Sequence, residues 1–373
     1  MWHATVTPLA SIIGSGFLVL GPILLKSYGS YAPLVMGGLC LTAYAFGSAI
    51  RFNIAQLEEL GSPAGSAESR LERLASWSLA IAYIISVAYY LNLFGAFGVS
   101  MTSVNDSAHA KLLTSAMFLL ILLAGWSRGF SALERMEQFS VSLKLAIIAG
   151  MLAGLTSFFW HHATHGELIF SPPDISGWAS VTLAFGLIVT VQGFETSRYL
   201  GTHYSAPVRI RSMRLAQWLS TGIYMLYILL LSFAFAPSKM VLSETAIIDM
   251  MTIVAPILPI LLIAAALSAQ FSAAIADTGG AGGLFAELTN NRLSQRQSYA
   301  VLVGIGLLLT WWANIFEIIS YASRAFALYY ALQAAIALLL ARRSGAPFAR
   351  QIMYAGLAGL GLLMALFGVP VEG

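Results

Sequence analysis

The chain has 373 residues, of which 58% are hydrophobic and only 9% are charged, and its mean hydropathy is +0.81. A soluble domain carries roughly a quarter charged residues, so this composition excludes a soluble protein and indicates an all-α membrane protein with many spans. The net charge of +3 comes without the basic, aromatic-interleaved segments that bind nucleic acid, and the single cysteine, Cys40, excludes an intrachain disulfide and a thiolate metal cluster.

A membrane helix needs about 20 apolar residues, and with this length as a guide we predict eleven spans. The first segment lacks a preceding Lys/Arg-rich stretch and is followed at once by a second, so we interpret it as a span and not as a cleavable signal peptide. The predicted spans cover residues 4–25, 32–50, 77–101, 111–126, 139–160, 178–200, 217–236, 256–276, 298–312, 315–340 and 351–369.

The positive charges between these spans separate cleanly when the N-terminus is placed inside, as expected because short cytoplasmic loops collect Lys and Arg. Lys144 and Arg324 fall within spans, and three lysines (Lys26, Lys111 and Lys239) fall outside. The remaining 14 of the 19 basic residues lie in cytoplasmic segments, namely Arg51, Arg70, Arg73, Arg128, Arg135, Arg198, Arg209, Arg211, Arg214, Arg292, Arg296, Arg342, Arg343 and Arg350. The sequence therefore predicts eleven spans with a cytoplasmic N-terminus and an external C-terminus.

Short glycine-centred segments interrupt the first and the sixth span, at Gly14-Ser15-Gly16 and at Gly193-Phe194-Glu195. A helix in lipid is continuous unless its freed backbone groups line a cavity or hold a ligand. Five spans separate the two breaks, so the second repeat enters the membrane from the opposite face and is inverted. We predict a first repeat over residues 1–160, an inverted repeat over 161–343, and an eleventh helix over 344–373.

Paired breaks predict a solute site between the two repeats. Backbone N–H groups of Gly14, Ser15 and Gly16 would face a carboxylate at the positive end of a half-helix, and carbonyls from Gln192 to Phe194 would accept an ammonium or a cation. Phe194 would close over the solute. The alternative is that Gly-Ser-Gly only lets helices approach closely, as small residues do in membranes.

These segments resemble the amino acid-polyamine-organocation (APC) superfamily. Ile12-Ile13-Gly14-Ser15-Gly16-Phe17 is similar to the family's first-helix break, and Gly193-Phe194-Glu195 with Pro207 and Arg209 is similar to its sixth-helix pattern. Leu143-Lys144-Leu145 resembles the fifth span of proton-coupled members, and Arg342-Arg343 closes the tenth span as in the family.

The chain also departs from that family in three places. Thr202-His203 stands where the family has Glu-Glu, Phe46 stands where the family has a glutamate after Tyr44-Ala45, and a twelfth span is missing. These departures bear on the substrate more than on the fold.

Charged residues inside the spans are the next candidates, because such residues are costly in a membrane and usually functional. Lys144 is predicted to gain and lose the coupling proton, or to stand in for a sodium ion, unless it snorkels to the interface. Glu195 is predicted to bind the solute or take part in proton coupling, with a pair to Arg198 as the alternative. Glu317 and Arg324 share a helix face and would form an outer gate. The alternative is that Glu317 sits at the outer interface beside Trp311 and Trp312, which leaves Arg324 to pair elsewhere.

Several other polar residues allow weaker predictions. Asp277 and Thr278 would approach Lys144, and one of the adjacent Tyr89 and Tyr90 would line the cavity. His161, His162 and His165 follow the fifth span; we interpret them as solvated loop residues and predict no metal site, because no further ligand was found beside them.

The resemblance and the breaks together imply a proton-coupled secondary transporter of a small amino acid or related zwitterion, in a bacterial cytoplasmic membrane. The predicted partners are this solute, the proton and the lipid bilayer, with no cofactor and no nucleic acid. An inorganic ion or an organic cation as cargo is the first alternative, and a membrane sensor or partner subunit without transport is the second. Catalysis is not predicted, because no nucleophile, base and acid occur together.

Overall fold

The computed structural model describes residues 2–14, 16–60, 66–127, 131–199, 204–290 and 292–371. Every regular element within these ranges is a helix, which confirms the predicted all-α class. The α-helices are α1 (Trp2–Ile12), α2 (Gly16–Tyr28), α3 (Ala32–Leu60), α4 (Ala67–Val99), α5 (Ser107–Ser127), α6 (Ser131–His165), α7 (Gly177–Gly186), α8 (Ala206–Ala234), α9 (Ala246–Val254), α10 (Leu258–Leu288), α11 (Gln295–Trp312), α12 (Ile315–Arg343) and α13 (Phe348–Phe367). Short 3-10 helices are η1 (Gly29–Tyr31), η2 (Ile188–Val191), η3 (Phe194–Tyr199) and η4 (Pro237–Lys239).

Eight helical segments of the described chain are long and apolar enough to cross a membrane, which confirms a multi-pass membrane protein. They are Gly16–Glu58, Ala67–Val99, Ser107–Trp126, Ser142–His165, Ala206–Ala234, Leu258–Leu288, Ile315–Arg343 and Phe348–Phe367. The helix α11 is 18 residues long, but Gln295, Arg296 and Gln297 make its first turn polar. The first and sixth predicted spans are each divided into short helices, so neither reaches spanning length alone.

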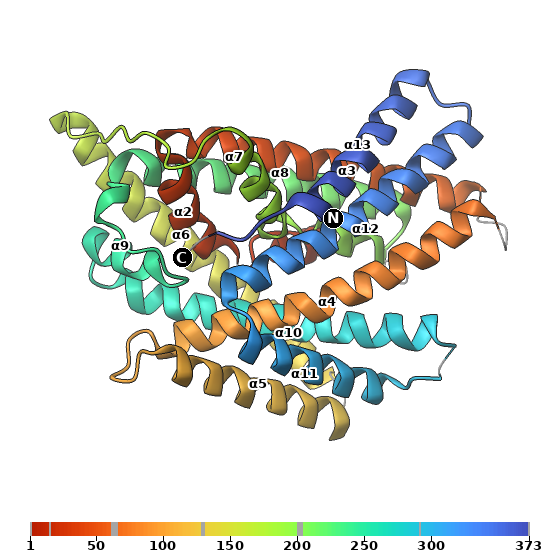
Figure 1. Ribbon diagram of the computed structural model, residues 1–373, viewed down its shortest axis with the longest axis horizontal. Helices are drawn as coiled ribbons and strands as arrows, with labels where there is room; N and C mark the ends of the chain where they lie inside the picture. The colour runs from red at the N-terminus through yellow and green to blue at the C-terminus, as the bar shows by residue number, and fades with distance from the viewer. Residues whose placement is uncertain are drawn as a thin grey trace.

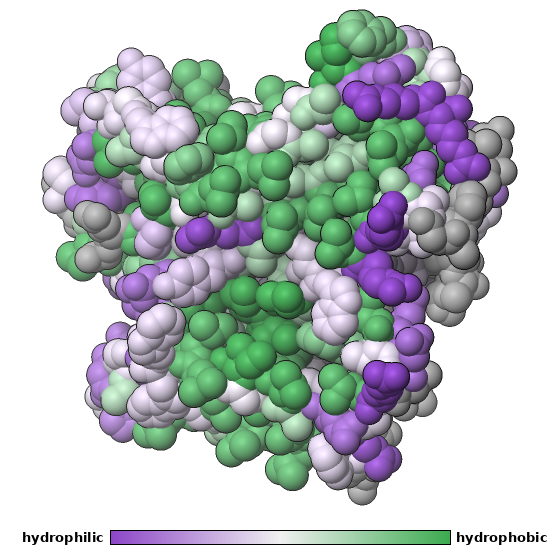
Figure 2. All heavy atoms as spheres, turned by 45° about the vertical axis from the view of Figure 1, so that its right-hand side comes forward, coloured by the Kyte–Doolittle hydropathy of each residue, from purple (hydrophilic) through white to green (hydrophobic). Residues whose placement is uncertain are grey.

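The long helices run roughly along the long axis of the molecule, and their turns gather at its two ends (Figure 1). The turns from α3 to α4, from α10 to α11 and from α12 to α13 lie at the right-hand end, whereas those from α4 to α5 and after α6 lie at the left. Hydrophobic side chains dominate the middle of the face in Figure 2, and hydrophilic ones gather toward its right edge. An apolar belt between polar ends is what a bilayer requires.

The helix α4 is central, because it packs against α10, α12 and α5 and is buried along most of its length. On one side of it, α1 packs against α8 and η3, and α6 packs against α10. Residues of α4, α6, α8, α10 and α12 lie against the two helix breaks. Their packing therefore brings residues from distant parts of the sequence to one place.

The three histidines after the fifth predicted span do not lie in a loop. The helix α6 continues through His165, so His161, His162 and His165 occupy its last turns. The predicted loop was wrong because the apolar run ends near Trp160, whereas the helical backbone of α6 continues to His165.

Candidate functional site

The first predicted span is broken at the expected glycines. The helix α1 ends at Ile12 and α2 begins at Gly16; Ser15, a predicted binding residue, lies outside the described residues. Ile13 N still donates to Leu9 O at 2.9 Å, but Phe17 N reaches back only to Gly14 O at 3.4 Å. The last carbonyls of α1 therefore need other partners.

Two side chains from other helices bind those carbonyls. Lys144 Nζ of α6 donates to Ala10 O at 2.8 Å, and the hydroxyl of Tyr224 on α8 lies 3.0 Å from Ile12 O and 2.6 Å from Thr190 O. Lys144 is 5% exposed, so it does not reach the interface as a snorkelling lysine would. A cation is favourable at this position because the carbonyl end of a helix carries a partial negative charge.

The sixth predicted span is also irregular, because α7 ends at Gly186 and is followed only by η2 and η3. Gly193 between them has a φ of +115°, and a Cβ atom there would lie 2.6 Å from the carbonyl carbon of Ser11 and 2.8 Å from Ile12 N. Gly16 similarly faces Thr190, whose Cα would lie 2.9 Å from an added Cβ. The two breaks thus touch each other, and glycine is required for this approach.

Glu195 is fully buried beside the second break. Its Oε2 accepts hydrogen bonds from Gly193 N at 3.0 Å and from the Tyr330 hydroxyl at 2.9 Å, whereas its Oε1 has no hydrogen-bond partner within the described chain. Arg198 does not pair with it, since that guanidinium binds Glu72. Gln192 is bonded on one side only, as Glu195 is: its Nε2 donates to the Tyr90 hydroxyl at 3.0 Å, and its Oε1 has no hydrogen-bond partner among the residues that the structure describes.

A polar cavity of about 20 Å³ lies where the breaks meet. It holds the predicted Lys144, Gln192, Gly193 and Glu195 together, and Asp277, which accepts a hydrogen bond from Ser86, lines it as well. The full lining is Ala10, Ser11, Tyr90, Lys144, Gln192, Gly193, Glu195, Thr196, Ala269, Ser272, Ala273, Ala276 and Asp277. This volume suffices for about one water molecule.

A second cavity of about 10 Å³ shares Lys144 and Ala269 with the first and reaches Gly14. Gln270 of α10 also lines it, although the side chain is fully buried and neither its Nε2 nor its Oε1 has a hydrogen-bond partner among the described residues. Gln270 was not among the site residues predicted from the sequence. It could have been, because a glutamine inside an apolar span is unusual in the same way as a charged residue.

The predicted Phe194 is buried in an aromatic stack. Its ring lies 5.1 Å from that of Tyr330 at an interplanar angle of 19°, and Tyr330 lies 5.2 Å from Phe46 at 23°. Phe46 therefore fills, with an apolar ring, the position at which the sequence departs from the resembled pattern. Of the adjacent tyrosines, Tyr90 lines the polar cavity.

The remaining predicted residues lie away from this cavity. Thr278 donates to Ala274 O of its own helix at 2.6 Å. Glu317 forms a capping box with Asn314 at the start of α12, with bonds of 2.7 and 2.9 Å, and Arg324 donates to Ala365 O of α13 at 2.7 Å. Each of the two predicted gate residues thus has another partner, and the gate stays a prediction. Thr202, His203 and Arg128 lie outside the described residues.

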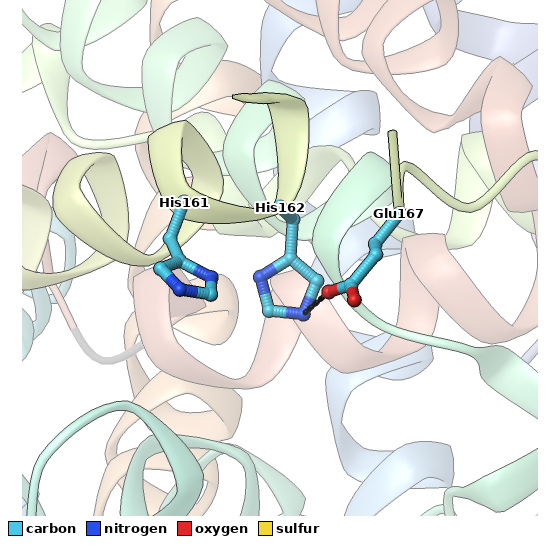
Figure 3. A group of neighbouring side chains, drawn as sticks. All are labelled: His161, His162 and Glu167. Carbon is cyan, nitrogen blue, oxygen red and sulfur yellow. Dashed lines mark ion pairs between the residues drawn. The ribbon is translucent and has the colours of Figure 1, made fainter. Parts of the chain in front are cut away.

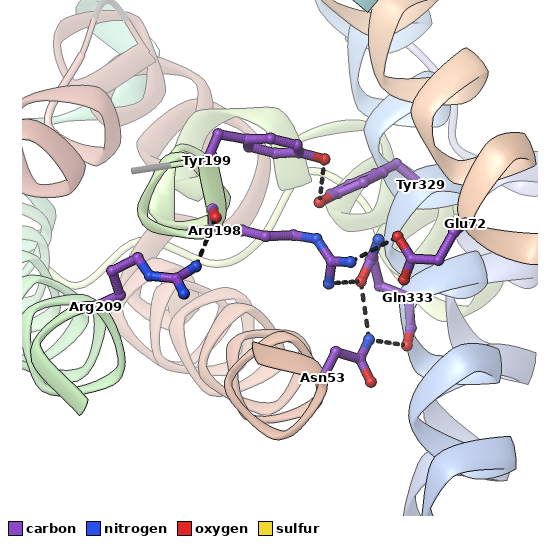
Figure 4. Close-up of polar contacts among 7 residues, drawn as sticks. All are labelled: Asn53, Glu72, Arg198, Tyr199, Arg209, Tyr329 and Gln333. Carbon is purple, nitrogen blue, oxygen red and sulfur yellow. Dashed lines mark hydrogen bonds and ion pairs between the residues drawn. The ribbon is translucent and has the colours of Figure 1, made fainter. Parts of the chain in front are cut away.

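A polar network with buried and partly buried members lies next to η3 (Figure 4). We call it the Arg198 network; it consists of Asn53, Glu72, Arg198 and Gln333. Arg198 binds Glu72 at 2.6 Å and Gln333 Oε1 at 2.8 Å, and Asn53 Nδ2 donates to the carbonyl and the side-chain oxygen of Gln333, both at 2.9 Å. It therefore joins η3 to α3, α4 and α12.

Arg209 extends this connection to α8. Its Nη1 donates to Arg198 O at 2.9 Å and its Nη2 pairs with Glu58 of α3. Arg209 was part of the sixth-span pattern in the sequence, and its contacts explain its position: it fixes the backbone of η3 three residues after Glu195.

The sequence of the chain is similar to a family of known proteins and to a relative in another organism. A family described as APC superfamily transporters matches residues 1–368. An uncharacterized protein of Aquifex aeolicus (strain VF5) is 41% identical over 383 aligned positions, which cover all of this chain and 92% of that protein. The family match covers nearly the whole of this multi-pass helical chain, and its two broken helices meet at a buried polar cavity. The chain is therefore a member of the APC superfamily of transporters.

Proposed function

We propose that the chain is a proton-coupled secondary transporter of a small amino acid or a related zwitterion. It would work by alternating access between repeats at residues 1–160 and 161–343, with eleven spans, a cytoplasmic N-terminus and an external C-terminus in a bacterial cytoplasmic membrane. No covalent step is involved: the chemistry is binding and conformational exchange.

The observation that carries the proposal is the set of buried polar atoms near the two breaks that have no hydrogen-bond partner within the described part of the chain. Each such atom costs about 1–3 kcal/mol when it is left unsatisfied, so most buried polar groups in proteins are paired. Gln192 Oε1 and Glu195 Oε1 are acceptors that fit an ammonium. The amide nitrogen of Gln270 is a donor that fits a carboxylate, as does the N-terminus of α2 beside Gly16.

The cavities are too small for an amino acid in this conformation, because about 20 Å³ and about 10 Å³ hold no more than single water molecules. The contact between Gly193 and α1 holds the two breaks together, and the Arg198 network ties η3 to α3, α4 and α12. We infer that the half-helices move apart to admit the solute, and that this motion exposes the polar atoms to one side of the membrane.

Lys144 supports coupling to protons. The Nζ of Lys144 donates a hydrogen bond to Ala10 O, and Lys144 lines the same cavity as Asp277 and Glu195. Loss of its proton would weaken its hold on the carbonyl end of α1, so that the position of this half-helix and the protonation of Lys144 depend on each other.

The test is uptake of labelled amino acids into liposomes that contain the purified protein, with and without an imposed proton gradient. We expect the gradient to drive accumulation in the unmodified chain and in Lys111→Ala, whose lysine lies at an end of α5, but not in Lys144→Ala. Lys144→Ala should still be produced and folded. Proton-driven accumulation that is unchanged in Lys144→Ala would contradict the coupling role.

The same assay separates the two alternatives. Accumulation of an inorganic ion or an organic cation that amino acids fail to displace would replace the proposed cargo. Specific binding of a solute without accumulation under any ion gradient would indicate a sensor or a partner subunit instead of a transporter.

A further inference from the structure

The end of α6 carries a group of metal-binding side chains that the solute site does not use. Figure 3 shows that the rings of His161 and His162 and the carboxylate of Glu167 point to the same side of the chain. One ligand atom from each lies within 4.8 Å of the others, and His162 Nε2 is 4.0 Å from Glu167 Oε2. Glu167 is the further ligand that the sequence pattern did not reveal.

The ring of His162 is held in the orientation that a metal ligand needs. Its Nδ1 lies 3.0 Å from the Phe158 carbonyl oxygen, and because a carbonyl only accepts, Nδ1 carries the hydrogen. Nε2 is then the nitrogen with a free lone pair, and it faces Glu167. A backbone carbonyl that orients a histidine in this way is the usual second partner of a metal-bound ring. The ring of Phe158 also packs against the imidazole in a tilted arrangement, with the ring centroids 4.3 Å apart and an interplanar angle of 44°.

The other two residues are similarly supported. His161 stacks on His165 at a centroid distance of 4.2 Å and an interplanar angle of 20°, and His165 Nδ1 in turn lies 2.8 Å from His161 O. Glu167 N donates to His162 O at 2.9 Å, which closes the end of α6 and keeps the Glu167 carboxylate beside the rings. The three ligands thus come from a fixed helix end.

We propose that His161, His162 and Glu167 bind a divalent transition-metal ion of the Zn²⁺ type. Two imidazole nitrogens and one carboxylate oxygen suit Zn²⁺, Ni²⁺ or Cu²⁺, whereas Mg²⁺ and Ca²⁺ prefer oxygen ligands. Tetrahedral bonds of about 2.0–2.1 Å place ligand atoms about 3.3 Å apart, so the side chains must draw together by about an ångström. Glu167 is 59% and His162 22% exposed, which leaves them room to do so.

A hydrated ion has a route to this site, and its binding would connect two segments. His162 lines a cavity of about 380 Å³ between the ends of α6 and α8 and the helix α9. The chain after Glu167 leads to α7 and is attached to α8 by Ile169 N, which donates to Phe233 O at 2.9 Å. A bound ion would therefore tie the end of α6 to the segment that enters the sixth predicted span.

The experiment is a metal titration of the whole purified protein, prepared with an affinity tag that contains no histidine and stripped with a chelator. Zn²⁺ binding is measured by calorimetry, and Co²⁺ is used as a second probe because its visible absorption rises strongly when protein ligands hold it in a four-coordinate site. Variants are His162→Ala, Glu167→Gln and the double variant His161→Ala/His162→Ala. His109→Ala is the matched control, because His109 and Asp106 form an exposed pair at 2.6 Å and, among the described residues, belong to no group of three metal-binding side chains.

We expect one Zn²⁺ per chain in the unmodified protein and in His109→Ala, and a rise in melting temperature on binding. Each single variant should weaken the affinity about tenfold or more, and the double variant should lose the Co²⁺ absorption. Unchanged Zn²⁺ affinity in the double variant, or no stoichiometric binding by the unmodified chain, would overturn the proposal and leave these residues as solvated side chains. Because the readouts are binding and stability, neither result depends on the proposed transport.

Discussion

Replacing Gln270 by methionine should stabilise the solute-free protein and remove transport. The amide of Gln270 is fully buried without a hydrogen-bond partner in the described chain, so the folded protein bears the cost of taking it out of water, about 1–3 kcal/mol. Methionine has a similar length and no amide. We therefore expect the free energy of unfolding of the solute-free protein to rise by about 1–3 kcal/mol in Gln270→Met, while solute uptake is lost.

Gln217 is the matched control, because it is also a buried glutamine but is fully bonded. Its Nε2 donates to Ala43 O at 2.8 Å and its Oε1 accepts from Arg51. Gln217→Met should lower the free energy of unfolding by about 1–3 kcal/mol, since it leaves Arg51 and Ala43 O without that partner. The assay is thermal unfolding in detergent, combined with uptake into liposomes. A lower stability in Gln270→Met, or uptake that remains normal, would refute the assignment of Gln270 to the solute.

Three further substitutions test the surroundings of the site. Gly193→Ala should destabilise the protein by about 2 kcal/mol or more in thermal unfolding, because the added Cβ would clash with α1 and the φ of +115° is unfavourable for alanine. Gly222→Ala is the control and should have little effect, since a Cβ there meets open space. Equal effects of the two substitutions would contradict the close contact of the breaks. Glu72→Gln should weaken the Arg198 network by about 1 kcal/mol, after allowance for the partial exposure of Glu72. In a chain that also carries Ser272→Cys and Cys40→Ala, this change should speed thiol labelling of residue 272 about fivefold. Glu68→Gln in the same helix is the control and should leave the labelling rate unchanged. Asn314→Ala should lower the free energy of unfolding by about 1 kcal/mol, because it removes the capping box of α12. Uptake per folded molecule should not change. Altered uptake would instead support the outer gate.

The positions of the helix breaks were predictable because they depend on local chemistry. Gly14 and Gly16 interrupt an apolar run, and the structure ends α1 at Ile12 and restarts the helix at Gly16. The interest of Lys144 was visible in the sequence for a related reason, because a lysine inside a span is costly, and the structure places it in the cavity beside the breaks. Its partner was not predictable, since nothing in the spacing of Ala10 and Lys144 connects them.

The helix ends were less predictable than the helices. His161 and His162 are polar, so hydropathy places them beyond the fifth span, yet they continue α6. Glu167 follows at a turn, and only the folded turn brings its carboxylate within reach of the two rings. Ligand groups of this kind depend on backbone direction, which hydropathy does not record.

The sequence by itself determined that this chain is a multi-pass helical membrane protein with two broken helices, because the absence of water in the bilayer dictates long apolar helices and penalises every break. Tertiary packing alone decided which polar groups meet at those breaks. Gln270, Tyr224 and Tyr330 lie far along the sequence from the residues that they face, and Phe194 turned toward an aromatic stack. Contacts between segments so far apart in the sequence depend on how whole helices pack against each other, and no short stretch of residues predicts that packing.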